Sequence, residues 1–443
     1  MGKNMYFCTQ KNDTTMKKAL PLIVLLALSG TILSQQMRLT PKTSRNTLYL
    51  DLDRIYDYNL YEQSRWGFGL TYEIPLFPQP VANIPKNSTI TPRSTYSHLL
   101  SLSGYVAWGY ADHRWKYGLT ASLRGLTGKL PLTYLLYFHD LTRDADRTMG
   151  TLDIGDLMLS TSHFMSSSFS STHRIAFGNS CLVTRKLRLG VDVRLSDERR
   201  LYGIGVSYPD DDLWPLLPRT RLAEGAFSAI YGNGMLRGEV TVGYFEYLKE
   251  YYPLTTSGFF ARAMAQYEEK YIMGTFYLRP YVQTGITSAQ APLSRTFDLG
   301  GTWGSPLLLG RAMVTARPAE FVANAYAISV VRFGFENPIF NLYSQLFQVG
   351  LAPRPFIHLG AMWGSIIQDG VLDIYGVTAP DKGFFEAGIG IDGLVQWGAV
   401  DWGIGVAYRM VPSDAPYCLS GTTSNLALLF TATLNSDMIK NFK

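Results

Sequence analysis

The sequence predicts an all-β fold, a transmembrane antiparallel β-barrel of roughly 16 strands that spans residues 46–435. Three observations lead to this prediction. Apolar and polar residues alternate along many segments, aromatic residues gather where those segments end, and a leader typical of exported proteins precedes them. Beyond that leader no run of about 18 apolar residues occurs, so the sequence offers no helical membrane span.

Residues 1–34 form the predicted leader, a secretory signal peptide. Lys17 and Lys18 precede the apolar run Ala19–Leu28, and small residues follow it as far as Ser34. Translation is expected to start at Met1 or at Met16. A membrane anchor is the alternative, although the apolar run is shorter than the roughly 20 residues that a spanning helix needs. We expect residues 35–45 to be a short periplasmic segment and residues 436–443 to be a C-terminal tail.

Strict alternation is the primary signal for strands. From Leu187 to Leu195 every odd position is aliphatic and every even position is charged or glycine. Successive strand side chains point to opposite faces, so such a segment has one apolar and one polar face. The same pattern recurs, without a helical interlude, in residues 48–53, 202–208, 236–242, 385–392 and 400–409. We therefore expect a single architecture whose first and last strands, near Leu48 and Leu428, pair to leave no open edge in hydrocarbon.

A soluble sandwich also alternates, so further features must decide between sandwich and barrel. The expected strands are about 9 to 13 residues long, which suits a tilted crossing of a bilayer. Connections are unequal: Tyr231–Gly234 is a tight hairpin turn, whereas Phe77–Thr95, Arg143–Ser170 and Thr287–Ala319 read as long loops. Short periplasmic turns opposite long outer loops are typical of an outer-membrane barrel.

Composition agrees with a membrane protein and excludes nucleic acid as a partner. Hydrophobic residues make up 47% of the chain and charged residues only 17%. The formal net charge is +5, and no run or stripe of basic residues appears.

No motif of an enzyme or cofactor-binding protein is present, so we expect no catalytic, metal-binding or cofactor-binding residues. The sequence lacks G-x-S-x-G, HExxH and a phosphate-binding loop. His139 opens the charged segment 139–146, and a hydrolase at the barrel rim would use such a histidine with a nearby Ser or Asp. The alternative interpretation is a solvated loop of mixed charge.

The side chains expected to face the lumen are of both signs. Strand parity places there Asp192, Arg194, Arg237, Glu239, Glu386, Asp392, Asp401 and Arg409. They either pair with one another and stabilise a plugged interior, or line a selective permeation path.

The C-terminal part resembles the bacterial surface antigen superfamily of BamA and TamA barrels. Within it, the chain is most similar to an uncharacterised barrel family of Bacteroides-like bacteria. The segments that carry the resemblance are residues 297–301, 310–311, 356–360, 388–391 and 405–409, with 59–69 and 318–324. The resemblance implies that the long loop folds into the lumen with Arg311 as its latch. Two departures put assembly activity in question: the order Leu309-Gly310-Arg311-Ala312, and His358 in place of an aspartate.

The resemblance also implies a function: a surface-antigen-type barrel of a Gram-negative outer membrane, linked to export, assembly or passage of envelope components. Outer-membrane lipid and, during insertion, the barrel assembly machinery would be its partners. Three alternatives stay open, namely a passive or substrate-selective channel, a barrel-rim hydrolase, and a secreted soluble β-protein. The sequence does not determine the oligomeric state.

Overall fold

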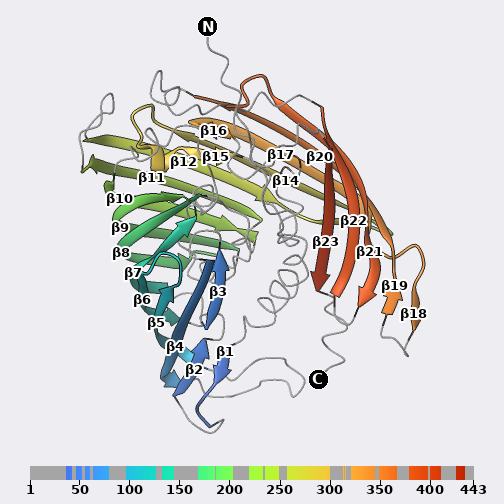
Figure 1. Cartoon of the computed structure of the whole chain (residues 1–443). Coiled ribbons are helices and arrows are strands. Elements are labelled where there is room, and N and C mark those ends of the chain that lie inside the picture. Colours follow the sequence, from blue (N-terminus) through green and yellow to red (C-terminus); the bar gives the residue numbers. More distant parts are fainter. Residues whose placement is uncertain are drawn as a thin grey trace.

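A computed structural model gives the architecture of the chain (Figure 1). It describes residues 36–41, 46–51, 55–59, 63–78, 96–125, 132–143, 168–184, 186–202, 219–232, 235–248, 257–299, 313, 315, 321–344, 349–366, 379–397, 400–410 and 426–434. In these ranges no helix has the length and apolar character needed to cross a membrane. The predicted leader and C-terminal tail lie outside them.

Nearly all of the described residues belong to antiparallel strands. The long strands are β4 (Gln63–Pro78), β5 (Tyr96–Gly109), β6 (Trp115–Gly125), β7 (Leu132–Arg143), β8 (Ser168–Leu182), β9 (Leu187–Tyr202), β10 (Thr220–Tyr231), β11 (Leu236–Tyr247), β12 (Ser257–Glu268), β14 (Phe276–Thr287), β17 (Ala325–Phe335), β20 (Arg354–Ser365), β21 (Phe384–Trp397), β22 (Val400–Arg409) and β23 (Leu426–Leu434). The short strands are β1 (Gln36–Arg38), β2 (Thr47–Asp51), β3 (Tyr56–Asn59), β13 (Tyr271–Met273), β15 (Phe297–Leu299), β16 (Phe321–Ala323), β18 (Leu342–Ser344) and β19 (Val349–Leu351), and a 3₁₀ turn, η8, covers Leu293–Arg295.

Each long strand pairs with the next long strand along the chain, which is the up-and-down topology of a barrel. β2 and β3 pair with separate parts of one edge of β4 and so act as a single interrupted strand. That strand and the fifteen long ones give sixteen positions in the described part of the sheet, in agreement with the predicted number. β1, inside the segment expected to be periplasmic, adds an edge strand on β2.

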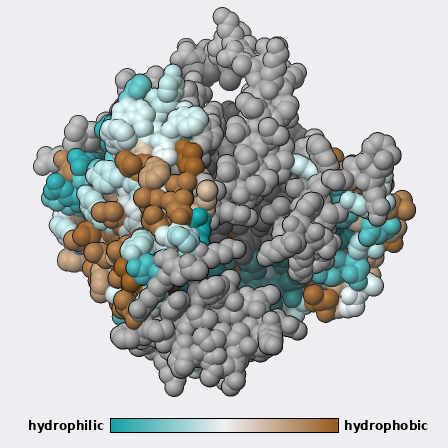
Figure 2. All heavy atoms as spheres, turned by 90° about the horizontal axis from the view of Figure 1, so that it is seen from below, coloured by the Kyte–Doolittle hydropathy of each residue, from teal (hydrophilic) through white to brown (hydrophobic). Residues whose placement is uncertain are grey.

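Burial along the strands is the reverse of that in a soluble protein. On β9 the aliphatic Val191, Val193 and Leu195 are 57%, 55% and 54% exposed, while the intervening Asp192 and Arg194 are 8% and 6% exposed. Hydrophobic side chains gather on the outer flank of the molecule in Figure 2. A sandwich would bury the aliphatic face and hydrate the charges. The fold is therefore a barrel with an apolar outer wall and a polar interior.

Closure of the sheet is the expectation that the structure does not reproduce. The described pairings give β23 one neighbour, β22, and give β2 only β1 and β4, so no ladder joins the first strands to the last. Figure 1 shows them as the two edges of the curved sheet. β1 already pairs with the outer edge of β2, and β3 is only 4 residues long, so the first strands offer β23 little free edge.

The connections differ in length between the two ends of the barrel. The tight turns between β8 and β9 and between β10 and β11 share one end with the start of β2 and the end of β23. The connections between β7 and β8, β9 and β10, and β14 and β17 lie at the other end, called here the long-loop end. The connection between β4 and β5 was predicted to be a long outer loop. It lies instead at the end with the tight turns, because successive strands run in opposite directions.

The described parts of the segment between β14 and β17 fold inward rather than out into solvent. Its short strand β15 pairs with β16 in a separate two-stranded sheet. Phe297, Leu299 and Met313 are at most 1% exposed, in a cluster with inward side chains of β14 and β17 such as Tyr281 and Tyr326. We call the described parts of this segment, residues 288–299, 313 and 315, the inner segment. The sequence did not show which side this segment faces; the structure places it inside.

Candidate functional site

The residues predicted to face the lumen take positions on the inner face wherever the structure describes them. The buried ones are Asp192, Arg194, Glu239, Glu386 and Arg409. Arg237 and Asp392 are half-buried. Arg311 and the Asp401 side chain lie outside the described residues.

Strand register brings several of these side chains into one network on the wall formed by β8 to β12. Arg194 donates through Nη2 to Oδ1 of Asp192 at 3.1 Å, and the same nitrogen lies 3.7 Å from Oε1 of Glu239. Arg174 donates to Glu198 at 3.2 Å. Opposite charges two residues apart on a strand, or on adjacent strands, share a face of the sheet, and this wall is organised in that way.

The centre of the network is Arg295, which the inner segment presents from η8. Its Nη1 and Nη2 donate to Oε2 and Oε1 of Glu198 at 2.9 and 2.8 Å. Its Nε and Nη2 donate to Oε1 and Oε2 of Glu224 at 2.6 and 2.7 Å. All three side chains are less than 10% exposed. One guanidinium thus satisfies two carboxylates on neighbouring strands, each in bidentate geometry, and we call this arrangement the Arg295 latch.

Local structure fixes the position of Arg295. Ala291 donates to the carbonyl of Ser288 at 3.0 Å, and Arg295 donates to that of Pro292 at 2.7 Å, which curls the chain into η8. Ala291, 3% exposed, packs with the cluster of Leu222, Phe245 and Phe260 on the inner wall. Apolar contact and ion pairing therefore act on the same short stretch of the inner segment.

The network on this wall contains charges of both signs in similar number. Its members are four carboxylates and four guanidinium groups, contributed by Asp192, Glu198, Glu224, Glu239, Arg174, Arg194, Arg262 and Arg295. The half-buried Arg237 adds a further guanidinium group on the same face. The guanidinium carbon of Arg262 lies 4.4 Å from the ring centroid of Phe297, on the inner segment, in a cation–π contact. The other seven charges lie in ion pairs, and charges that are removed from water are tolerated when they are paired in this way.

A second set of contacts anchors the C-terminal part of the inner segment, residues 313 and 315. Thr315 donates through its backbone N and its hydroxyl to Oε2 of Glu386 on β21, at 2.8 and 2.6 Å. Nε2 of His358 on β20 lies 2.7 Å from the other oxygen of Glu386. A Cβ built on Gly360 would lie 2.6 Å from the sulfur of Met313, so glycine leaves room for the segment to approach the wall.

Asp392 and Arg409, two more of the predicted residues, contact charged or aromatic side chains of β17 to β22. Arg332 bonds to Asp392 and stacks over Phe356, with its guanidinium carbon 3.6 Å from the ring centroid. Arg409 lies 4.4 Å from the ring centroid of Phe384. These contacts tie the strands to one another and do not reach the Arg295 latch.

Sequence reasoning missed the residues of the latch. Glu198 and Glu224 follow the parity of β9 and β10, but both lie beyond the segments whose alternation is clean. Arg295 lies in a loop, where no periodicity indicates which way a side chain points. Arg311 was chosen by resemblance, whereas the described latch is sixteen residues earlier in the chain.

His139, the residue of the hydrolase hypothesis, lies at the long-loop end of β7. Its ring stacks on that of His173 with centroids 3.8 Å apart, and its Nε2 lies 3.2 Å from the hydroxyl of Ser171. Asp140 faces the other side of the sheet, where it accepts from Arg65 at 2.8 Å. In the described part of the chain no group of three or more His, Cys, Asp or Glu side chains is arranged to hold a metal ion.

Three solved structures to which the chain is similar are outer-membrane proteins. BamA from Haemophilus ducreyi lacking POTRA domains 1–3 is 11% identical over 94% of this chain and 79% of its own, with a TM-score of 0.43. CdiB from Escherichia coli is 10% identical over 89% of this chain and 63% of its own, with a TM-score of 0.41. The FrpB iron transporter from Neisseria meningitidis is 8% identical over 88% and 62%, with a TM-score of 0.35.

The chain therefore spans less than two thirds of the length of CdiB. No protein-family model matches its sequence, and no curated protein matches it either. The resemblance to a particular family of Bacteroides-like bacteria is thus not supported.

Proposed function

We propose that the chain is an integral outer-membrane β-barrel of a Gram-negative bacterium, exported by its signal peptide and inserted by the barrel assembly machinery. We propose further that it is of the surface-antigen type, with a lumen that the inner segment closes at rest. Its role would be the regulated export, assembly or passage of envelope components. The observation that carries the proposal is the Arg295 latch, because it joins the inner segment to two strands of the wall.

The latch favours a gated barrel over a passive channel for an energetic reason. Withdrawal of Arg295 would leave Glu198 and Glu224 with too few cations at a buried site, and breaking a buried ion pair costs about 3 to 5 kcal/mol. That cost holds the inner segment in place at rest. A component that offers the two glutamates a replacement cation would offset the cost, so the same latch permits release.

Conductance in planar bilayers tests this proposal. We expect the wild-type barrel to stay near the background and Arg295→Ala to open frequently, because the inner segment then loses its ionic anchor. Arg279→Ala is the matched control: it removes an arginine from a pair with Glu268 that lies outside the latch. Glu224→Gln should act in the same direction as Arg295→Ala, with a smaller effect.

Two outcomes would contradict the proposal. A wild-type barrel that conducts steadily, with Arg295→Ala unchanged, would support the passive channel instead. A barrel that stays silent even after removal of residues 288–319 would show that passage through the lumen is not its function.

Ester hydrolysis at the rim is a second candidate, favoured by one contact, that of His139 with Ser171. A Ser–His pair is the core of many hydrolases, but its serine must reach substrate. Ser171 is 7% and His139 9% exposed, and Asp140 is on the opposite face. We propose instead that His139 packs the rim and that the protein is not an enzyme. Lipid or peptide hydrolysis lost in His139→Ala would refute this.

A further inference from the structure

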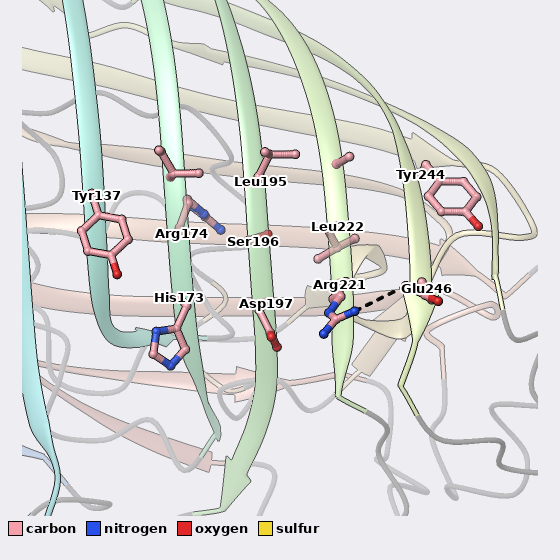
Figure 3. A pocket seen from close by; sticks show the side chains of 12 residues that line it. Tyr137, His173, Arg174, Leu195, Ser196, Asp197, Arg221, Leu222, Tyr244 and Glu246 are labelled. Carbon is pink, nitrogen blue, oxygen red and sulfur yellow. Dashed lines mark ion pairs between the residues drawn. The ribbon is translucent and has the colours of Figure 1, made fainter.

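The carboxylates on the outer face of the wall are paired with arginines, like those of the inner network. A pocket of 390 Å³ opens on the outer faces of β7 to β11, and Figure 3 shows Arg221 directed toward Glu246 there. The two side chains are 4.0 Å apart, and Arg219 donates to both oxygens of Asp197 at 2.5 Å. On the inner face of the same wall, by contrast, the cation of Arg262 on β12 has no such partner.

Arg262 is a buried cation without an ion pair. It is 7% exposed, and in the described part of the chain no carboxylate pairs with it. Its Nε and Nη2 are buried and have no hydrogen-bond acceptor. These are the two nitrogens with which Arg295 holds Glu224 and Arg194 holds Asp192. The edge of the guanidinium group that suits a carboxylate is therefore unused in Arg262.

The inner segment covers this guanidinium group with the ring of Phe297. The cation–π contact of 4.4 Å satisfies the face of the guanidinium group but none of its N–H groups. The opposing wall holds the ring in place, since the centroid of Tyr326 lies 4.6 Å from that of Phe297. A buried donor without an acceptor is unfavourable, and more so when it is charged. The inner segment thus closes over a group that its own contact satisfies only in part.

A carboxylate within reach of Arg262 also has an unused oxygen. Oε1 of Glu239 accepts from Thr241 at 3.0 Å and lies 3.7 Å from Nη2 of Arg194, whereas its Oε2 is buried without a hydrogen-bond partner. Arg262 pairs with Thr241 in the strand register, so Glu239 is its diagonal neighbour on the same face of the sheet. Diagonal neighbours are about 7 to 8 Å apart, within reach of long side chains. A donor edge and an acceptor oxygen therefore lie on adjacent strands without meeting.

We propose, on the basis of the gated lumen proposed above, that Arg262 and Glu239 form an ion pair when the inner segment withdraws. Phe297 keeps them apart while the segment is in place. Once the ring is gone, the guanidinium group turns toward Glu239 and uses Nε and Nη2 as Arg295 does. Closure of the lumen then breaks one ion pair while the Arg295 latch forms two.

This exchange regulates the gate. The pair in the withdrawn state narrows the difference in free energy between the closed and the withdrawn inner segment. A client whose affinity for the two states differs only modestly is then able to shift the equilibrium between them. Arg262 and Glu239 therefore set how readily the Arg295 latch releases.

Opening frequency in planar bilayers tests the proposal in the Glu224→Gln barrel, whose weakened latch makes openings countable. We expect Arg262→Met in this barrel to lower the opening frequency roughly tenfold, since it removes both the pair of the withdrawn state and the unsatisfied charge of the closed state. Arg262→Lys keeps the charge and should stay within about threefold of the Glu224→Gln barrel. If Arg262 served only to anchor Phe297, its loss would instead raise the opening frequency.

Arg332→Met is the matched control. Arg332 is also 7% exposed and also stacks on a phenylalanine, but that ring is Phe356 of the wall and Arg332 is paired with Asp392. The substitution should leave the opening frequency unchanged. A heat-modifiable shift in gel migration establishes that each variant is folded.

A second measurement follows the inner segment without any current. The hydroxyl oxygen of Ser294 is buried, so a cysteine at this position should react with a water-soluble maleimide only when the segment withdraws. The labelled chain carries serine in place of Cys181 and Cys418. Arg262→Met should slow this labelling by the same factor as it lowers the opening frequency.

A double-mutant cycle identifies Glu239 as the partner of Arg262. Glu239→Gln leaves Arg194 with Asp192 and should lower the opening frequency as Arg262→Met does. The two substitutions together should have no greater effect than either alone. The proposal is overturned if Arg262→Met raises opening and labelling or leaves them unchanged, or if the effects of the two substitutions add. Labelling that responds as expected in a barrel without current would retain the exchange and refute passage through the lumen.

Discussion

At the scale of single residues, the choice of arginine at position 295 is decisive. Its planar guanidinium presents several N–H groups in fixed directions, so it satisfies Glu198 and Glu224 at once, with four hydrogen bonds of 2.6 to 2.9 Å. A lysine would place a single point charge between the two carboxylates and could not bond both in bidentate geometry. The inner segment is therefore held by a residue whose shape, and not only whose charge, fits the wall.

Removal of that one side chain should be costly. We expect Arg295→Ala to lower the free energy of unfolding by about 3 to 5 kcal/mol, because two buried carboxylates lose their partner. Urea unfolding in lipid vesicles measures this. Lys270→Ala, which removes an exposed pair with Glu336, serves as the control and should cost about 1 kcal/mol or less.

A double variant tests whether charge pairing holds the Arg295 latch. Glu224→Gln combined with Arg295→Met removes one charge of each sign and leaves Glu198 with Arg174. The double variant should be more stable than Arg295→Ala alone. If it is less stable, the latch is held by something other than charge pairing.

At the scale of elements, the strands show how well the alternation of apolar and polar residues predicts which face a side chain takes. β9 follows the predicted pattern from Leu187 to Leu195 and continues to Tyr202. β10 violates it, since Leu222 points inward and Arg221 outward. The inward leucine packs on Ala291 of the inner segment, and the outward arginine lies beyond the aliphatic band. Both exceptions occur where a strand meets something other than lipid or lumen water.

The depth of a residue in the membrane predicts how much an arginine at that position of β9 destabilises the protein. Val191 lies in the middle of the exposed aliphatic band and Leu195 at its edge, on the same face of the same strand. We expect Val191→Arg to lower the free energy of unfolding in vesicles by about 2 to 4 kcal/mol and Leu195→Arg by about 0 to 1 kcal/mol. Equal costs at both positions would contradict the assignment of this face to lipid. Val191→Leu is the neutral control.

At the scale of the whole molecule, the protein reverses the arrangement of a soluble protein: aliphatic side chains are exposed and charged side chains are buried. Such a surface is stable only in contact with hydrocarbon. The mature protein should therefore stay in the membrane fraction after high-salt and carbonate washes and enter solution only with detergent. A protein that fractionates as soluble without detergent would overturn the barrel and every proposal that depends on it.

The sequence by itself determined the fold class, because the period of two in segments such as Leu187–Leu195 depends only on strand geometry. It also determined the polar inner face that contains Asp192, Arg194 and Glu239. Only the tertiary structure decided that the inner segment turns into the lumen and that Arg295 is its latch. These features join residues about 70 to 100 positions apart, and no local period records which strands the chain brings together.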